Sequence, residues 1–308
     1  MEQVDLLAMC RVRGVSWHFL AREAQRPEGM ERLCGGRALE ESRDATKSLA
    51  ALAGAREDLA DRQRVVEAML TAAAADGIGL TTVLDEDYPV NLRTIYNLPP
   101  FLFYRGTLRP DDALSVAVVG TRQATAEGLG RAERMARLLV DGGVTVLSGL
   151  ARGIDTAAHQ ACLDAGGRTI AVLGSGIRRV YPPENAALAE RIAEHGAVVS
   201  QFWPDANPAT YTFPRRNVVT SGMSQGTVVI EASATSGAKM QARLAIEHGK
   251  QVFLLHSLVT EREWARGYLQ RPRVHEVHDV ADILRLLRPA AEQRDRAMER
   301  VQLPLTLF

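Results

Sequence analysis

The 308-residue chain has few cysteines and no long hydrophobic run. Its three cysteines are scattered and odd in number, which argues against a disulfide framework and indicates reduced thiols. No apolar stretch approaches the roughly 20 residues needed to span a bilayer. The acidic start, Met1-Glu-Gln-Val-Asp5, lacks a signal-peptide pattern. We therefore expect a cytoplasmic protein with no membrane partner.

The chain also lacks an excess of charge of either sign. It has 37 basic and 37 acidic residues, and lysine occurs only at Lys47, Lys239 and Lys250. A net charge of zero does not favour nucleic acid as a ligand, so any attraction to a polyanion must be local. The hydrophobic content of 46% is ordinary for a globular protein with a large core.

Several motifs of nucleotide and metal chemistry are missing. There is no G-x-x-x-x-G-K-[ST] phosphate loop, and Gly174-Ser-Gly-Ile-Arg-Arg179 has arginine where a dinucleotide fold needs its third glycine. His275 and His278 are three apart in an expected strand, so they point to opposite faces and cannot share a metal ion. We expect no cofactor, no metal site and no catalytic residues.

What the chain does have is a repeated unit of apolar strand, glycine loop and helical segment. The expected strands lie near residues 115–120, 144–148, 169–174, 197–202, 227–231, 251–256 and 273–277. Continuous apolar runs of this kind are typical of parallel strands covered by helices on both faces. The sequence thus predicts a doubly wound, mostly parallel, Rossmann-like α/β sheet.

Other segments flank this sheet. Residues 1–82 are rich in alanine, leucine, arginine and glutamate and predict a small helical N-terminal domain, whose simplest role is packing. Residues 83–288 are expected to form the Rossmann-like domain, and prolines in its entry connector, 83–114, exclude a helix there. Asp279 is a plausible N-cap for the last helix of that domain. Residues 289–308 are expected to be a flexible tail.

The glycine loops predict an anion site. In a parallel sheet, ligands bind beyond the carboxyl ends of the strands, and the loops at Gly120-Thr-Arg122, Ser148-Gly149 and Gly174-Ser-Gly176 follow three such ends. Glycine lets the backbone approach a phosphate, and the helix that follows favours anions. The alternative is that the small residues only let strand and helix pack closely.

Phe213-Pro-Arg-Arg-Asn217 is the sharpest local feature. Two arginines, an amide and an aromatic ring near a helix start offer phosphate contacts and base stacking, although a solvated helix cap is the simpler alternative. Glu231 could be a general base, but we interpret it as an acceptor for backbone N–H groups or for Arg215 or Arg216. Asp155 and His159 are interpreted as helix stabilisation because no nucleophile is nearby.

Taken in order, these motifs resemble the DNA-processing protein A family (DprA, also called Smf). The resemblance runs from about Asp87-Tyr-Pro89 to residue 285, roughly two thirds of the chain, and includes Leu147–Asp155, Tyr181-Pro182 and Glu231-Ala232. It implies a protein that binds single-stranded DNA without catalysis, forms a homodimer and loads a RecA-type recombinase during recombination or transformation (competence). The residues expected to contact DNA are Gly120, Thr121, Arg122, Ser148, Gly149, Gly174, Ser175, Gly176, Phe213, Arg215, Arg216, Asn217, Ser236, Gly237 and Lys239.

The chain departs from the family pattern after residue 217. Val218 stands where the family usually has arginine, Ala238-Lys-Met-Gln-Ala242 replaces an apolar stretch, and Leu255-His-Ser257 replaces a Pro-Gly. These departures point to an altered pocket on that side, with Lys239 as a substitute phosphate contact, and they leave the recombinase contact open.

The last residues resemble the peptide with which bacterial proteins bind the sliding clamp. Gln302, Leu303, Leu305, Leu307 and Phe308 give a glutamine, spaced leucines and a terminal aromatic ring. The alternatives are a chance match or a tail that packs on its own domain.

The sequence therefore favours a non-enzymatic protein that protects single-stranded DNA, assists recombinase loading and is tethered to the sliding clamp. A second hypothesis is a nucleotide-binding sensor or a phosphoribohydrolase-like enzyme of the related Rossmann-like group. That group carries a Pro-Gly-Gly-x-Gly-Thr loop, which this sequence lacks. A third is an interaction scaffold with a degenerate pocket.

Overall fold

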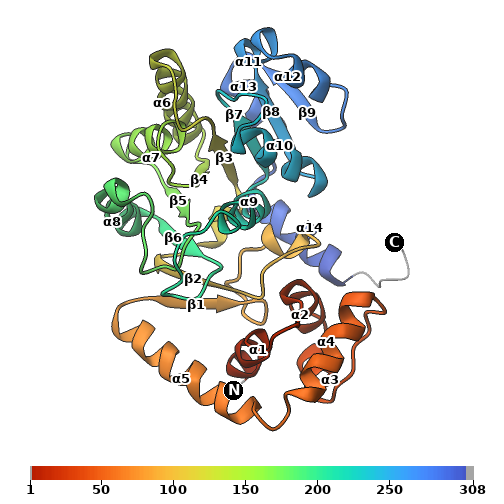
Figure 1. Ribbon diagram of the computed structural model, residues 1–308. Helices are drawn as coiled ribbons and strands as arrows, with labels where there is room; N and C mark the ends of the chain where they lie inside the picture. Colours follow the sequence, from red (N-terminus) through yellow and green to blue (C-terminus); the bar gives the residue numbers. More distant parts are fainter. Residues whose placement is uncertain (1, 303–308) are drawn as a thin grey trace.

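The computed structural model describes residues 2–302 and is built around one nine-stranded sheet (Figure 1). The strand order is β1-β2-β6-β5-β4-β3-β7-β8-β9; β3 to β9 pair in parallel, while β2 runs antiparallel to both β1 and β6. The strands are β1 (Gly79–Thr82), β2 (Phe101–Gly106), β3 (Ser115–Val119), β4 (Thr145–Ser148), β5 (Thr169–Val172), β6 (Ala197–Ser200), β7 (Gly226–Val229), β8 (Gln251–Leu255) and β9 (Val274–Val277).

Helices cover both faces of the sheet because the central strands are apolar on both. In β3, Val116 and Val118 belong to one core, whereas Ala117 and Val119 belong to the other, as the period of two in a strand requires. The first core is closed by α6 (Ala126–Asp141), α7 (Ile154–Asp164) and α13 (Val280–Leu284). The second is closed by α8 (Ala186–His195), α9 (Thr212–Met223) and α10 (Gly237–Glu247). This confirms the predicted doubly wound fold.

The N-terminal helices lie beyond β1 and β2 at one end of the molecule (Figure 1). Their buried side chains, such as Leu6 and Phe19, belong to the same core as Leu254 of β8. The predicted helical part is confirmed, whereas its boundary at residue 82 remains a prediction. The helices are α1 (Glu2–Cys10), α2 (Trp17–Ala24), α3 (Gly29–Cys34), α4 (Arg43–Gly54) and α5 (Leu59–Ala75). Among residues 2–302, no helix is long and apolar enough to cross a membrane.

The entry connector contains a strand that the sequence did not predict. No α-helix forms there, but the expected exclusion of any helix is too strong, since short 3₁₀ helices lie at Leu92–Thr94 and Pro110–Ala113. Phe101–Gly106 forms β2, which pairs with β6 and with β1. Tyr88 is buried in the same connector, and its hydroxyl donates to the Pro99 carbonyl at 2.6 Å. The aromatic segment Phe101–Gly106 therefore extends the sheet laterally, beyond β6, which is the outermost parallel strand on that side.

The C-terminal part also differs from the expectation. Short helices α11 (His256–Glu261) and α12 (Glu263–Tyr268) link β8 to β9, and Asp279 caps α13 as predicted. Residues 290–302, however, form helix α14 (Ala290–Gln302) rather than a flexible tail. The reason is a docking contact, in which the Gln293 amide donates to the Asn91 side chain at 2.8 Å and Ala297 is buried. The clamp-like residues Leu303–Phe308 lie outside the described residues.

Candidate functional site

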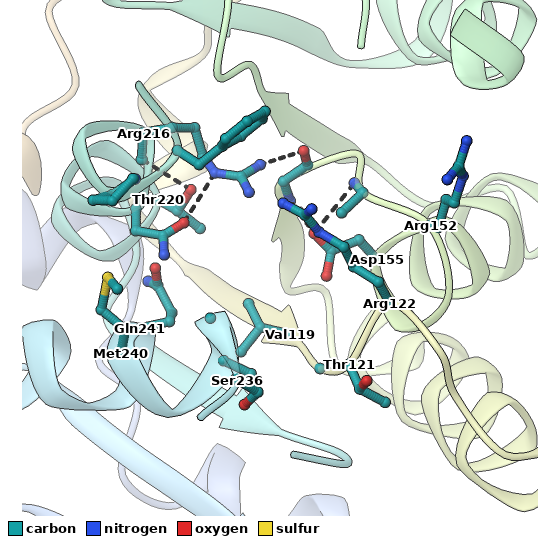
Figure 2. A pocket seen from close by; sticks show the side chains of 18 of the residues that line it. Val119, Thr121, Arg122, Arg152, Asp155, Arg216, Thr220, Ser236, Met240 and Gln241 are labelled. Carbon is teal, nitrogen blue, oxygen red and sulfur yellow. Dashed lines mark hydrogen bonds between the residues drawn. The ribbon is translucent and has the colours of Figure 1, made fainter. Parts of the chain in front are cut away.

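A cavity of about 570 Å³ lies where the strand order reverses (Figure 2). From β3 the chain proceeds through β4 and β5 to β6 on one side, and then returns to place β7 on the other side of β3. The loops beyond β3, β4 and β7 diverge at this point, which is the usual ligand crevice of such sheets. Nine predicted residues line the cavity: Gly120, Thr121, Arg122, Gly149, Phe213, Arg216, Asn217, Ser236 and Gly237.

The loop after β3 is fixed by backbone and side-chain bonds. Thr121 N–H donates to the Glu231 carbonyl at 2.8 Å, and Thr125 caps α6 by accepting from Gly128. The Glu231 carboxylate accepts from the N–H and the hydroxyl of Thr125, at 3.2 and 2.9 Å. The prediction of a backbone acceptor at Glu231 thus holds, but its partner is Thr125 and not Arg215 or Arg216.

In the loop after β4, two backbone N–H groups donate to a carboxylate of the helix that follows. The Asp155 carboxylate accepts from Gly149 N–H at 3.1 Å and from Ala151 N–H at 3.4 Å, so the Gly149 N–H does not face the cavity as a free donor. Leu150 is held at a φ of 57°, a strained conformation for a non-glycine residue that this network sustains. Burial raises the pKa of Asp155, and Arg216 opposes that rise.

Arg216 is a buried wall of the cavity rather than an exposed phosphate ligand. Its guanidinium donates to the carbonyls of Gly149 and Val172 and, at 3.0 Å, to the Asn217 side chain. Burial lowers the pKa of Arg216, while the Asp155 carboxylate opposes that change. Figure 2 shows Arg216 reaching across the cavity toward the loop after β4, which lies beside Asp155 of α7. The residue therefore joins α9 to the ends of β4 and β5.

Arg122 offers an exposed cation beside aromatic rings. Its guanidinium lies 5.2 Å from the centre of the Phe213 ring, and the Phe213 ring is 5.7 Å from that of Tyr181. The Tyr181 ring is 42% exposed, which leaves part of it free for another flat group. Arg152, which pairs with Glu184, lines the same cavity. A cation beside exposed rings can hold a phosphate and a stacked base together.

The third glycine loop does not line this cavity, so the DNA contacts expected of Gly174, Ser175 and Gly176 stay a prediction. A Cβ on Gly174 would lie 2.7 Å from the Phe213 ring, so this glycine makes room for that ring. Ser175 is buried and donates to the Arg179 carbonyl, and Gly176 N–H donates to Ala206. The alternative reading, that small residues serve close packing, holds for this loop.

Three further predicted residues also lie off the cavity lining. Ser148 is buried and donates its hydroxyl to the Val118 carbonyl at 2.7 Å, which ties β4 to β3. Arg215 is exposed, with its guanidinium 5.6 Å from the Tyr211 ring. Lys239 points its ammonium at the Trp264 ring, 5.6 Å from the ring centre, while Ser236 caps α10 by accepting from Lys239 N–H. The proposed role of Lys239 as a phosphate contact gains no support from this geometry.

Sequence reasoning did not assign several residues of the site. Arg152 and Tyr181 lie in motifs that the sequence comparison singled out, but neither was given a role. Asp155 was read as helix stabilisation, whereas it orders the loop before the helix. Gln241, Met240 and Thr220 line the wall opposite Arg122 and Arg152 (Figure 2). Their spacing along α9 and α10 does not mark them as site residues, because the sequence does not show which faces of the two helices meet.

Burial keeps two histidines neutral, one on α7 and one at the end of α10. His159 bonds with the Thr169 hydroxyl at 2.7 Å, and burial, with a smaller contribution from Arg216, lowers its pKa to about 3. His248 bonds with Ser221 at 2.9 Å, and burial, with Lys250, lowers its pKa to about 4. Away from the cavity, His256, Glu276 and His278 form a group of potential metal ligands that the sequence analysis did not anticipate.

The fold and this crevice define a Rossmann-like α/β protein with arginine and aromatic side chains at the switch point of its sheet. The family model for DNA recombination-mediator protein A matches residues 79–287. The chain belongs to this family of DNA-processing proteins, as the sequence resemblance predicted.

Relatives support this assignment. The chain is 36% identical over 290 residues to protein Smf of Synechocystis sp., a match that covers 92% of this chain and 70% of that protein. It is 39% identical over 174 residues to DNA processing protein DprA of Streptococcus pneumoniae, covering 56% of this chain and 61% of that protein. It is 44% identical over 175 residues to protein Smf of Escherichia coli, covering 55% and 46%. The chain thus spans less than two thirds of the last two proteins.

Solved structures agree with the fold. The crystal structure of DprA from S. pneumoniae superposes with a TM-score of 0.73 at 26% identity, covering 92% of this chain and 98% of that one. DprA from Helicobacter pylori superposes with a TM-score of 0.59 at 25% identity, covering 67% and 94%, and its structure describes a single-stranded DNA binding mode. The chain is therefore a DNA-processing protein of the DprA/Smf type.

Proposed function

We propose that this protein binds single-stranded DNA in the cavity at the switch point, with Arg122 and Phe213 at the centre of the interface. The observation that carries the proposal is the exposed Arg122 guanidinium 5.2 Å from the Phe213 ring. The single-stranded DNA binding mode described for the H. pylori relative supports it.

The surroundings of Arg122 favour a polyanion. Helices α9 and α10 both begin at the cavity, at Thr212 and Gly237, and the N-terminus of a helix attracts anions. Arg152 adds a second exposed cation, and Tyr181 extends the aromatic surface beyond Phe213. A backbone phosphate at the arginines and a base against the rings would be bound without base-edge contacts, so binding should tolerate any sequence.

A titration of labelled oligothymidine, followed by fluorescence anisotropy, tests this proposal. The double variant Arg122→Ala/Arg152→Ala should bind at least about 10-fold more weakly, because two phosphate contacts are removed. Arg137→Ala is the matched control, since Arg137 is exposed on α6 and pairs only with Glu133 among the described residues. Equal affinity of the double variant and the control would refute the proposed site.

We further propose that the cavity binds without catalysis. Asp155 is the carboxylate among the described lining residues, and it is buried and engaged by two N–H groups. Glu231, the other candidate base, is engaged by Thr125. The alternative of a phosphoribohydrolase-like enzyme predicts hydrolysis of nucleoside monophosphates. Incubation with each of them and analysis of released base distinguishes the two, and turnover abolished by Asp155→Asn would establish the enzyme.

Assistance to a RecA-type recombinase and formation of a homodimer are proposals that rest on the family alone. Light scattering at several protein concentrations tests the dimer. One chain has a mass of 33.6 kDa, and the dimer should have twice that mass. Recombinase filament formation on DNA coated with a single-strand-binding protein tests loading. Faster filament formation with the native chain than with the Arg122→Ala/Arg152→Ala variant is the expected result.

Attachment to the sliding clamp through Gln302, Leu303, Leu305, Leu307 and Phe308 is a separate proposal. Its support is the sequence pattern alone, since Leu303–Phe308 lie outside the described residues. Deletion of residues 302–308 should abolish binding to purified clamp and leave the affinity for oligothymidine unchanged. Unchanged clamp affinity after the deletion would refute this proposal without affecting the DNA site.

A further inference from the structure

Three potential metal ligands meet where β8 and β9 end, apart from the cavity described above. In the parallel pairing of these strands Leu255 is the partner of Val277, so the residues that follow, His256 and His278, lie across from each other. Glu276 and His278 are two residues apart and share a face of the extended chain. The register thus brings two imidazoles and a carboxylate to one place at the edge of the sheet.

The side chains lie close together. His256 Nδ1 is 2.5 Å from Glu276 Oε1, and the rings of His256 and His278 are stacked, with their centres 4.6 Å apart and their planes at 28°. One ligand atom from each residue lies within 4.8 Å of the other two. The His278 backbone N–H donates to the Asp282 carboxylate at 2.9 Å, which holds that residue against the start of α13.

We propose that His256, Glu276 and His278 form a binding site for a divalent transition-metal ion, of which Zn²⁺ is the best match. Two imidazole nitrogens and a carboxylate oxygen suit Zn²⁺ and its neighbours better than Mg²⁺ or Ca²⁺, which prefer oxygen ligands. Three protein ligands leave a fourth position open to water. The ion replaces the direct contact between His256 and Glu276 and ties β9 to β8.

The side chains can reach metal-ligand distances with small movements. Zn²⁺ sits about 2.0–2.2 Å from nitrogen and oxygen ligands, so the three ligand atoms must lie roughly 3.5 Å from one another. His256 Nδ1 and Glu276 Oε1 must therefore separate from 2.5 Å, and ligand atoms that lie farther apart must come closer. His256 is 57% exposed and Glu276 31% exposed at the side chain, so neither must break a packed core to move. Rotation about side-chain bonds therefore suffices to close the site.

The structure offers a matched control in the same strand. His275 points to the other face of β9, where its Nε2 lies 2.9 Å from Gln251 Oε1 and its ring packs near Phe253. It has the same chemistry and nearly the same place in the chain, but it does not belong to the group. A second control, His195, is exposed on α8 and bonds with the Arg191 carbonyl.

Isothermal titration calorimetry with ZnCl₂ tests the site on the full-length chain after treatment with a chelator. All proteins carry Cys34→Ser, because Cys34 is an exposed thiol that could bind zinc by itself. The parent should bind one ion per chain at this site. His256→Ala and His278→Ala should each weaken that binding at least 10-fold, and Glu276→Gln should weaken it measurably. His275→Ala and His195→Ala should leave it unchanged.

Cobalt gives a second readout that does not depend on stability. Co²⁺ bound by two histidines and a carboxylate produces visible absorption bands, which should be present in the parent and absent in His256→Ala. Circular dichroism shows whether each variant is folded. Absence of Zn²⁺ binding by the parent, or equal binding by the His256→Ala, His278→Ala and His275→Ala variants, would overturn the proposal and leave an ion pair with stacked rings.

Discussion

Arg215 and Arg216 are neighbours in the chain but lie in opposite environments. Successive residues of a helix point about 100° apart, so one face of α9 buries Arg216 while Arg215 faces solvent. Arg216 bonds with the carbonyls of Gly149 and Val172, and Arg215 lies over the Tyr211 ring. Arg216 stabilises the walls of the cavity, and Arg215 is available to a ligand.

This difference predicts that the same substitution has a large effect on stability at Arg216 and a small one at Arg215. Arg216→Ala leaves the carbonyls of Gly149 and Val172 without this donor and removes the cation that opposes the effect of burial on Asp155, so the free energy of unfolding should fall by about 3 kcal/mol. Arg215→Ala removes an exposed side chain and should change it by less than about 0.5 kcal/mol. Urea denaturation measures both variants. A similar small change for both would mean that the Arg216 contacts contribute little.

The buried histidines predict how stability depends on pH. The folded-state pKa values of His159 and His248 are lowered to about 3 and about 4, against an ordinary value of 6.5 for an unfolded chain. The unfolded chain therefore takes up protons as the pH falls below 6.5, while the folded protein does not. Stability should be full above pH 6.5 and fall by about 1.4 kcal/mol per pH unit per histidine toward pH 4.

Urea denaturation at pH 7.5, 6.0 and 5.0 checks this dependence. His159→Asn keeps a side chain that can bond with Thr169 but does not titrate, so it should reduce the pH slope by the share of one histidine. His195→Ala, on the surface of α8, serves as the control and should keep the full slope. A slope in the His159→Asn variant equal to that of the native chain would contradict the assignment.

At the scale of elements, the position of a loop after a strand was predictable only where no distant part of the chain alters it. The sequence predicted β3 to β9, several of them from continuous apolar runs, and the loops at Gly120 and Gly149 reach the cavity as the topology requires. The loop at Gly174 has the same sequence signature but is filled by Phe213, which comes from a helix 39 residues later in the chain. A local pattern cannot reveal an occupant from so far away.

The same limit applies to β1, β2 and α14. The run at Phe101–Gly106 has the aromatic composition of a strand, but its partners are Gly79–Thr82 and Ala197–Ser200, which no local signal connects to it. The polar composition of 290–302 suggested a flexible tail, whereas a few long-range contacts, such as Gln293 with Asn91, hold it as a helix. Tertiary contacts thus decided the elements that the sequence alone left unassigned.

The docked helix predicts a contrast between two truncations. Ending the chain after residue 289 removes Gln293 from the buried Asn91 and uncovers the surface under Ala297, so stability should fall by about 2 kcal/mol. Ending it after residue 302 keeps α14 and its contacts, so this chain is the control. Differential scanning calorimetry of both truncated chains measures the difference. Equal melting temperatures would mean that α14 does not stabilise the fold.

At the scale of the whole molecule, a neutral protein carries a local cationic surface. The net charge is zero, so the proposed attraction to DNA must come from a few arginines gathered at the switch point. The continuous core that joins the N-terminal helices to the sheet holds those loops on one framework. The affinity should therefore fall as the salt concentration rises, with a slope set by the number of local phosphate contacts and not by the overall charge.

The most direct test of the account is the salt dependence of oligothymidine binding by the native chain and by Arg122→Ala. The logarithm of the affinity should fall linearly with the logarithm of salt concentration, and the slope for Arg122→Ala should be shallower by about 0.7, the value for one phosphate contact on a single strand. Arg137→Ala should keep the native slope. Slopes that coincide for Arg122→Ala and the native chain would contradict DNA binding at the switch point.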